Sequence, residues 1–247
     1  MNSDSSKLAV AMAVLVAAPV VQADTLTVGS WTASAGDQVR ITSPIDISTR
    51  ASRFLGNVTS STLPEGIFVD SKDALYGYCY DVFEYLAQGG NTYEVVFGLN
   101  PPNAWGVTQS TLDFLGAVNA TIPGGSVYDW LHPTGQWQAA AIQIGIWETL
   151  YDNTGPFDLA AGSFQVTGLE TETVAALSAI RANSGTIDAS WVMVLHAEGR
   201  SGGQDVITGR RGPERITRQV PEPATAVLLV AAAAAAGLAR RRTTQAA

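Results

Sequence analysis

The chain contains a single cysteine, Cys79, among its 247 residues. A disulfide within the chain is therefore impossible, which excludes the disulfide-stapled class of secreted scaffold. Its two histidines, His132 and His196, lie far apart in the sequence. One cysteine and two distant histidines are too few for a zinc cluster, so we expect no metal. The sequence also lacks a phosphate-binding loop and a serine-nucleophile elbow, and we expect no cofactor.

Charged residues are scarce, at 15% of the chain, whereas hydrophobic residues make up 46%. This balance argues against a chain that is disordered throughout. Between Asp24 and Gly199, five basic residues stand against 18 acidic ones, which leaves a net charge of −13. Phosphate binding needs a basic footprint, so we expect no nucleic-acid partner.

The N-terminus has the pattern of a secretory signal peptide. Lys7 precedes an apolar run over Leu8–Val21, and a small residue, Ala23, stands at the expected cleavage position. The run is short for a membrane-spanning helix, which favours cleavage over a permanent anchor. We therefore assign residues 1–23 to a signal helix that is removed on export.

The C-terminus carries three features in a fixed order. Pro221, Glu222 and Pro223 precede an apolar segment over Ala224–Ala239, and Arg240, Arg241 and Arg242 follow it. A helix of that length reaches about 24 Å, short of a typical hydrocarbon core, but snorkelling arginines allow it to span. The arginines would stay cytoplasmic, which places the domain on the outer side of the membrane.

This tail, residues 220–247, resembles the PEP-CTERM sorting signal. The resemblance implies recognition and cleavage by an exosortase-type membrane enzyme, in a Gram-negative bacterium that forms an extracellular matrix. It also implies transient anchoring in the inner membrane by the transmembrane-like helix, followed by delivery to the envelope, outer surface or matrix. An ordinary C-terminal anchor is the alternative, and it gives the same outward location.

We expect one secreted domain over residues 24–199 and a flexible linker over residues 200–219, because that stretch is polar, basic and contains glycine. The predicted fold is α+β: a β-rich barrel or sandwich with two to three helices. Alternation predicts strands over 25–28, 38–42, 66–70, 76–84, 93–98, 163–167 and 190–196. Helical spacing predicts helices over 108–119, 136–150 and about 169–183.

Two polar residues stand out in apolar surroundings. Cys79 lies in the aromatic run Tyr78-Cys79-Tyr80, and Gln143 lies among alanines and isoleucines on the most apolar predicted helix. A buried amide must find hydrogen-bond partners. On the residues alone, a glutamine that bonds to a neighbouring segment is the simpler interpretation.

The pair nevertheless resembles the thioester domains of Gram-positive surface adhesins. In those domains a cysteine between aromatic residues is joined to the glutamine of a Thr-Gln-x-Ala-Ile/Val-Trp motif. Cys79 matches that cysteine, Gln143 the glutamine, and Trp147 the final residue of the motif, with Tyr78 and Tyr80 as supporting neighbours. Two positions depart from the motif, since Ile142 replaces threonine and Gly145 replaces alanine.

The resemblance implies an internal Cys79–Gln143 thioester that captures an amine or hydroxyl of an unknown extracellular target. Such a protein is a single-use covalent binder and not a turnover enzyme. His132 is the candidate base near the thioester. The chain has two lysines, Lys7 and Lys72, and only Lys72 remains after signal removal. Few amines are then available to quench a reactive acyl group, although a compositional preference for arginine explains the same scarcity.

Two other interpretations stay open. The first is a passive structural matrix protein in which Cys79 is a buried free thiol and Gln143 a hydrogen-bonding core residue. The second, carbohydrate binding, relies on tryptophans that core packing also explains. A paired-acid hydrolase is disfavoured because carboxylate pairs are common on solvated faces. The candidate acids for it are Asp81, Glu84, Glu148 and Asp152.

The signal-peptide assignment predicts the mature N-terminus. We expect the exported chain to begin at Asp24, because cleavage follows the small residue Ala23. Intact-mass measurement of protein recovered from the envelope or medium checks this. An exported chain that retained residues 1–23 would show instead that the apolar run is an uncleaved anchor.

Overall fold

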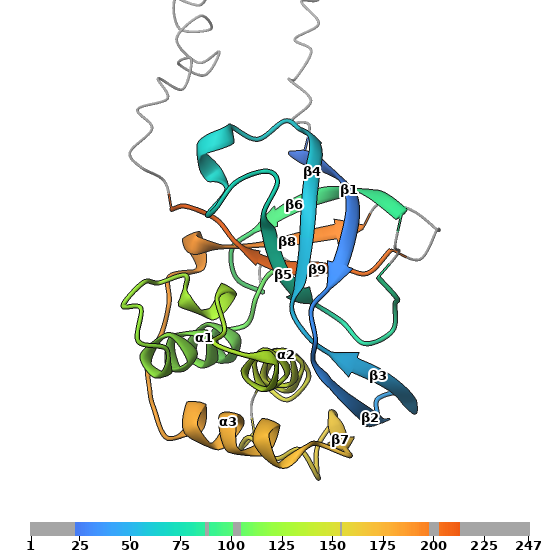
Figure 1. Cartoon of the computed structure of the whole chain (residues 1–247), viewed down its shortest axis with the longest axis vertical. Coiled ribbons are helices and arrows are strands. Elements are labelled where there is room, and N and C mark those ends of the chain that lie inside the picture. Colours follow the sequence, from blue (N-terminus) through green and yellow to red (C-terminus); the bar gives the residue numbers. More distant parts are fainter. Residues whose placement is uncertain (1–22, 87–88, 101–104, 154, 198–202, 213–247) are drawn as a thin grey trace, which may run out of the picture.

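The computed structural model describes residues 23–86, 89–100, 105–153, 155–197 and 203–212. Their main feature is a closed antiparallel β-barrel with strand order β1-β4-β5-β9-β8-β6 (Figure 1). The barrel strands are β1 (Thr25–Ala33), β4 (Phe54–Ser61), β5 (Leu75–Cys79), β6 (Gly89–Phe97), β8 (Val192–Ala197) and β9 (Val206–Gly209). Closure leaves the barrel without an unpaired edge.

A smaller sheet and three helices pack together at one end of the barrel (Figure 1). The sheet has the order β3-β2-β7, and three short 3-10 turns, η1, η2 and η3, connect other elements. The bounds are β2 (Asp37–Ser43), β3 (Ile47–Ala51), β7 (Gln165–Thr167), α1 (Gln109–Thr121), α2 (Gln136–Tyr151), α3 (Thr171–Arg181), η1 (Glu65–Ile67), η2 (Asp129–Leu131) and η3 (Ala189–Trp191). The predicted α+β class is confirmed; of the predicted barrel or sandwich with two to three helices, the described residues form the barrel with three helices.

Helix α2 is the centre of this helical layer. Every residue from Ala139 to Thr149 is buried, because α1, α3 and the β2–β3 hairpin all pack against it. Apolar side chains around its whole circumference make such a helix stable only inside a protein. Helix α1 beside it starts at a side-chain cap, in which Thr108 Oγ1 accepts a hydrogen bond from Thr111 N at 3.0 Å.

Most predicted elements are present, but with changed limits. The strand predicted over 66–70 is wrong: η1 occupies Glu65–Ile67, and only Phe68 makes a single bridge to Arg210. The sequence Pro64-Glu65-Gly66 favours a turn there. The strand predicted over 76–84 ends at Cys79. Strands β3, β4 and β9 were not predicted.

Strand β9 corrects the predicted domain boundary. It lies between β5 and β8 and closes the barrel, and all four of its residues are buried. The flexible linker predicted over 200–219 is therefore wrong for residues 203–212, which belong to the domain. The run Val206-Ile207-Thr208 is β-branched and suits a strand. The polar, glycine-containing residues on both sides of it favoured the linker prediction instead.

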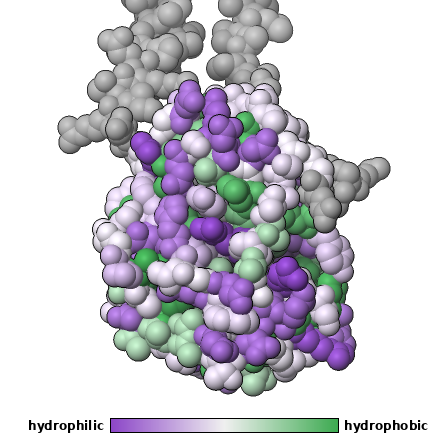
Figure 2. All heavy atoms as spheres, viewed as in Figure 1, coloured by the Kyte–Doolittle hydropathy of each residue, from purple (hydrophilic) through white to green (hydrophobic). Residues whose placement is uncertain are grey.

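The predicted signal helix (1–23) and sorting tail (220–247) lie outside the described residues, apart from Ala23, as do residues 213–219 of the predicted linker. Within the described ranges, none of the helices combines the length and apolar character that crossing a bilayer requires. Figure 2 shows hydrophilic and hydrophobic residues interspersed over one face of the domain.

The contact between α1 and α2 yields a stability prediction at Gly145. A Cβ added there would overlap the ring of Phe114. Alanine is a better helix former by about 1 kcal/mol, but overpacking a core costs about 1–3 kcal/mol. We expect Gly145→Ala to lower the free energy of unfolding by about 1 kcal/mol in urea denaturation. In a Phe114→Leu background, Gly145→Ala should lower the free energy of unfolding by less. An equal loss in the wild-type and Phe114→Leu backgrounds would exclude the Phe114 ring as the obstacle.

Candidate functional site

Gln143 and Cys79 lie side by side in the structure. Cys79 N donates a hydrogen bond to Gln143 Oε1 at 2.8 Å, and Gln143 Nε2 donates one to Cys79 O at 2.9 Å. The amide of Gln143, on α2, therefore satisfies both peptide groups of Cys79, at the end of β5. Gln143 is fully buried and Cys79 is 7% exposed. We call these two residues the Cys79–Gln143 pair.

The strand pairing explains why a side chain fills this role. Strand β4 begins at Phe54, which pairs with Gly77, so β4 does not extend alongside Cys79. On the other side of β5, Cys79 is in register with Val206, and Tyr80 N donates to Asp205 O of the segment leading into β9. The peptide groups of Cys79 point away from β9 because they alternate along a strand. The Gln143 amide takes the place that a longer β4 would occupy.

The surroundings of Cys79 disfavour a thiolate. Burial raises the pKa of the Cys79 thiol, and the nearby charge of Asp81 raises this pKa further. No disulfide is formed, and the thiol is free. Reactive cysteines usually have a lowered pKa, so this thiol needs a proton acceptor close by before it can act as a nucleophile.

A small cavity of about 20 Å³ lies against Cys79. Its lining includes Asp81, Glu84, Trp147 and Gln204. A cavity of this size has room for about one water molecule. Ammonia is of similar size, so the space beside Cys79 is sufficient for one small polar molecule.

The three aromatic residues named as supporting neighbours hold this region in place. Tyr78 stacks on Trp130 and donates from its hydroxyl to Trp130 O at 3.1 Å. Tyr80 donates to Gly106 O at 2.9 Å, and burial raises its pKa to about 12. Trp147 lies four residues after Gln143, so both share one face of α2. Its Nε1 is buried and finds no hydrogen-bond partner among the residues that the structure describes.

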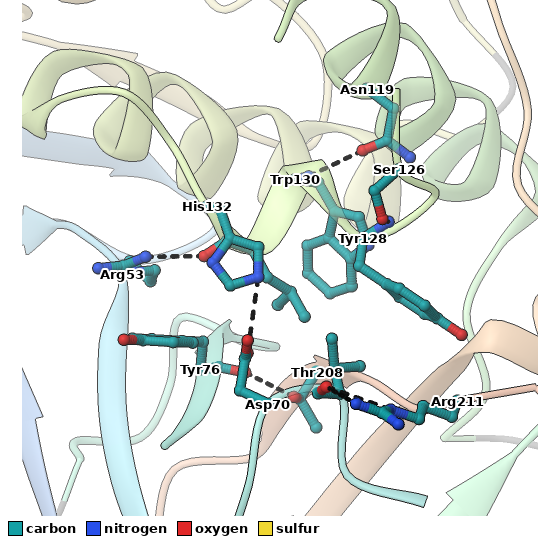
Figure 3. Close-up of polar contacts among 12 residues, drawn as sticks. Arg53, Asp70, Tyr76, Asn119, Ser126, Tyr128, Trp130, His132, Thr208 and Arg211 are labelled. Carbon is teal, nitrogen blue, oxygen red and sulfur yellow. Dashed lines mark hydrogen bonds and ion pairs between the residues drawn. The ribbon is translucent and has the colours of Figure 1, made fainter. Parts of the chain in front are cut away.

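His132, the predicted candidate base, lies outside the barrel strands, at the end of η2. It packs edge-on against Tyr76 and lies 3.5 Å from the Asp70 carboxylate, and Figure 3 shows its ring directed at Asp70. Tyr76 is three residues before Cys79 on β5, a separation of about 10 Å along a strand. The structure gives no contact between His132 and the Cys79–Gln143 pair.

Other groups near the pair were missed because they lie at the end of β8 or in the segment taken for a linker. Gln204 Nε2 donates to Asp81 O at 2.9 Å. Asp205 is buried and accepts a hydrogen bond from Ala197 N at 2.8 Å, while its other oxygen lies 2.9 Å from His196 Nδ1. The β-branched run after Asp205 was the one available signal that this segment joins the barrel.

Three carboxyl groups come together beside the pair. Ligand atoms of Asp81, Glu84 and Asp205 lie within 4.8 Å of one another. Burial raises the pKa of Asp81 and of Glu84, and repulsion by neighbouring carboxylates adds to both shifts. A hard cation such as Ca²⁺ takes six to eight oxygen ligands, and these three carboxyl groups, counted with one oxygen each, supply three of them.

Glu148 and Asp152, the other two candidate acids for a hydrolase, have structural partners. Glu148 Oε1 accepts a hydrogen bond from Asp158 N at 2.7 Å, and burial raises the pKa of Glu148 to about 7. Asp152 accepts hydrogen bonds from Ser163 N and Phe164 N, both at 2.8 Å. These contacts tie the end of α2 to the segment before β7.

Comparison with known proteins identifies the C-terminal segment. Residues 219–242 match the family model of the PEP-CTERM protein-sorting motif, which covers the Pro221-Glu222-Pro223 sequence and the arginines that follow the apolar segment. The motif implies processing by an exosortase, and proteins that carry it are exported and sorted to the cell surface. Neither the curated proteins nor the solved structures gave a match to the chain.

The geometry of the pair predicts the cost of removing the Gln143 amide. In a Cys79→Ala background, which excludes any Cys–Gln bond, Gln143→Leu leaves the N–H and C=O of residue 79 buried without partners. Each of the two orphaned groups costs about 1–3 kcal/mol, so we expect a loss of about 2–6 kcal/mol in urea denaturation. Gln136→Leu, at the exposed start of α2, is the matched control and should change stability by less than about 0.5 kcal/mol. Equal effects of the two changes would contradict the structural role of Gln143.

Proposed function

We propose that this exosortase-sorted, exported protein is an adhesin-like surface or matrix protein that stores an internal thioester between Cys79 and Gln143. The thioester would attach the protein covalently, once, to an amine or hydroxyl of an extracellular target. One observation carries the proposal: the only cysteine of the chain has both of its peptide groups hydrogen-bonded to the Gln143 amide, at 2.8 and 2.9 Å.

This pairing brings the reacting atoms close together. The amide carbon of Gln143 joins the two atoms that bond to Cys79, and Sγ lies two bonds from the Cys79 Cα, so the two reacting groups are neighbours. Productive attack needs about 3–3.5 Å, which a rotation of the cysteine side chain and a small shift of the amide would have to supply. Holding an unreactive amide in such geometry provides the high effective concentration that the reaction requires.

Thioester formation exchanges a C–N bond for a C–S bond. Cys79 Sγ attacks the amide carbon, the C=O bond becomes a C–O⁻ bond in the tetrahedral intermediate, and collapse of that intermediate expels the nitrogen as ammonia. The thiol proton ends on the departing nitrogen, so no other reactant is consumed. The Cys79 N–H already donates to Oε1, which is where negative charge develops.

Asp81 is the proposed proton carrier for this exchange. It lines the same small cavity as Cys79, and burial brings its pKa upward from the ordinary carboxyl value. A carboxylate in that position accepts the thiol proton and returns it to the leaving nitrogen. The cavity has space for one ammonia-sized molecule. His132 takes no part in this route because it packs against Tyr76, which is about 10 Å from Cys79 along β5.

Capture of the target breaks the C–S bond and forms a new bond between the target and the acyl carbon. The nucleophile of the target attacks the acyl carbon of residue 143, the C–S bond breaks, and Cys79 leaves as a thiol after taking up the proton that the nucleophile loses. The product is an amide or an ester, and the cysteine is not acylated again without a new acyl donor. The protein is therefore consumed by its reaction and does not turn over.

The composition of the mature chain is compatible with a stored acyl group. Lys72 is the only lysine after residue 23, and the other basic side chains are arginines. Guanidinium groups stay protonated and are poor nucleophiles. Self-reaction with side-chain amines is therefore limited to one residue.

A passive structural protein is the second candidate, and a specific observation favours it. The two hydrogen bonds of Gln143 satisfy a buried amide and the end of β5 without any covalent chemistry. In that case Cys79 is a buried thiol with a raised pKa. Mass measurement separates the two candidates because only one of them loses ammonia.

For the mature chain beginning at Asp24, we expect an intact mass lower than the sequence mass by one ammonia. Methylamine should restore mass as an adduct that peptide mapping locates at Gln143, and it should release one titratable thiol. Cys79→Ala should show the full sequence mass and no adduct while keeping the circular dichroism of the parent. An unmodified mass, with Cys79 titrating after unfolding without amine, would support the passive structural role instead.

A further inference from the structure

A larger pocket of about 370 Å³ lies next to the small cavity. The end of the barrel forms one side through Tyr80, His196 and Asp205, and the C-terminal end of α2 forms another through Leu150 and Tyr151. Trp105 stacks on His196, with ring centroids 4.1 Å apart and planes 20° apart. We call this space the aromatic pocket.

The sheet register relates this pocket to the reactive pair. Cys79 pairs with Val206, and Val206 pairs with Leu195, so these three side chains share one face of the barrel wall. The next residue on each strand points to the other face. Tyr80, Asp205 and His196 accordingly line the aromatic pocket, while Cys79 lines the small cavity; Asp81 and Glu84 line both.

The distance between the two places follows from strand spacing. Gln143 bonds to one flank of β5, and Asp205 bonds to the other flank through Tyr80 N. Two strand spacings of about 4.8 Å put the Gln143 amide and the Asp205 backbone about 10 Å apart. A target group held in the aromatic pocket is therefore too far away to attack the acyl carbon of residue 143. The attacking nucleophile would be a neighbouring group on the same target.

The lining has the chemistry of a cation site. Trp105, Tyr80 and Tyr151 offer aromatic rings, and Asp81, Glu84 and Asp205 offer carboxylates, whereas none of the described lining residues is a lysine or arginine. Aromatic faces attract cations, more strongly where water is partly excluded. A ligand with an apolar stem and a charged end matches walls of this kind.

The surface around the opening is also unusual for this domain. Among the described residues, five large apolar side chains are exposed, and three of them, Phe83, Tyr85 and Trp105, line the aromatic pocket or the small cavity. Trp105 is 43% exposed. Exposed aromatic side chains gathered at a pocket mark an interaction site.

We propose that the aromatic pocket is a recognition subsite for a positively charged side chain of the target, close in sequence to the residue that the thioester captures. This inference rests on the proposed function. It adds a selection rule: a target segment with a basic residue about 10 Å from its nucleophile reacts faster, because binding of the cation holds the nucleophile at the acyl carbon.

The test compares two peptide probes on the mature wild-type chain. The first is acetyl-Lys-Gly-Arg-amide, and the second is acetyl-Lys-Gly-norleucine-amide. Arginine cannot replace lysine as the nucleophile, and residues two apart in an extended peptide are about 7 Å apart before their side chains extend. We expect the arginine peptide to form adducts about tenfold faster in low salt, followed by intact mass, with the advantage shrinking as salt is added.

Two pocket variants and one control sharpen the comparison. Trp105→Leu and Glu84→Gln should bring the ratio of the two peptide rates close to one. Glu172→Gln removes one negative charge from the exposed start of α3, which does not line the pocket, and should keep the wild-type ratio. The ratio of the two peptide rates is measured on one variant at a time, so a general change in the reactivity of that variant cancels.

Methylamine separates the two possible failures. If methylamine forms an adduct with the wild-type chain and the two peptides react equally fast, the recognition subsite is overturned and the thioester stands. If methylamine forms no adduct, both the thioester and the subsite that depends on it are overturned. A ratio that Glu172→Gln lowers as much as Glu84→Gln would also overturn the subsite, since overall charge would then explain the preference.

Discussion

The hydrogen bonds between the Gln143 amide and the peptide groups of Cys79 join the two halves of this domain. Strand β5 extends beyond the start of β4, and the buried helix α2 supplies the missing partner from its side. A fully apolar helix can rotate and slide against its neighbours at little cost. A single amide with two fixed partners sets the position of α2 against the barrel, because a misplaced helix would leave four buried polar groups unsatisfied.

The same burial that fixes this geometry works against the proposed chemistry. Removing Cys79 from water raises the pKa of its thiol, so alignment is gained while nucleophilicity is lost. The nearby carboxyl groups compensate only if one of them accepts a proton. Burial, and then repulsion by neighbouring carboxylates, raises the pKa of Asp81 and Glu84 and so suits them to hold protons closer to neutral pH. In the proposed reaction, α2 would supply position and the turn after β5 would supply proton transfer.

Much of this arrangement was accessible from the sequence because it depends on local pattern. The repeat of Trp137, Ala140, Ile144 and Trp147 predicts α2, and the polar Gln143 within it predicts a buried partner. Closure of the barrel was not accessible, since β9 is a four-residue strand and one of its two partners, β5, is far away in sequence. The same long-range pairing brings Asp205 beside Tyr80. His132 is a candidate base by residue type alone, and residue type does not show that it packs against Tyr76, three residues before Cys79 on β5.

The late position of β9 also has a mechanical meaning. Gly209, its last residue, is ten residues before the matched sorting motif, which begins at residue 219. A pull on the C-terminal end would therefore first load the bonds of Arg211 N to Ile67 O and of Gly212 N to the Tyr128 hydroxyl, and then this strand. β9 is paired directly with β8 and with β5, whose last residue is Cys79. A load between the cell and a molecule held at Gln143 would pass through these pairings and through the hydrogen bonds that join β5 to the middle of α2.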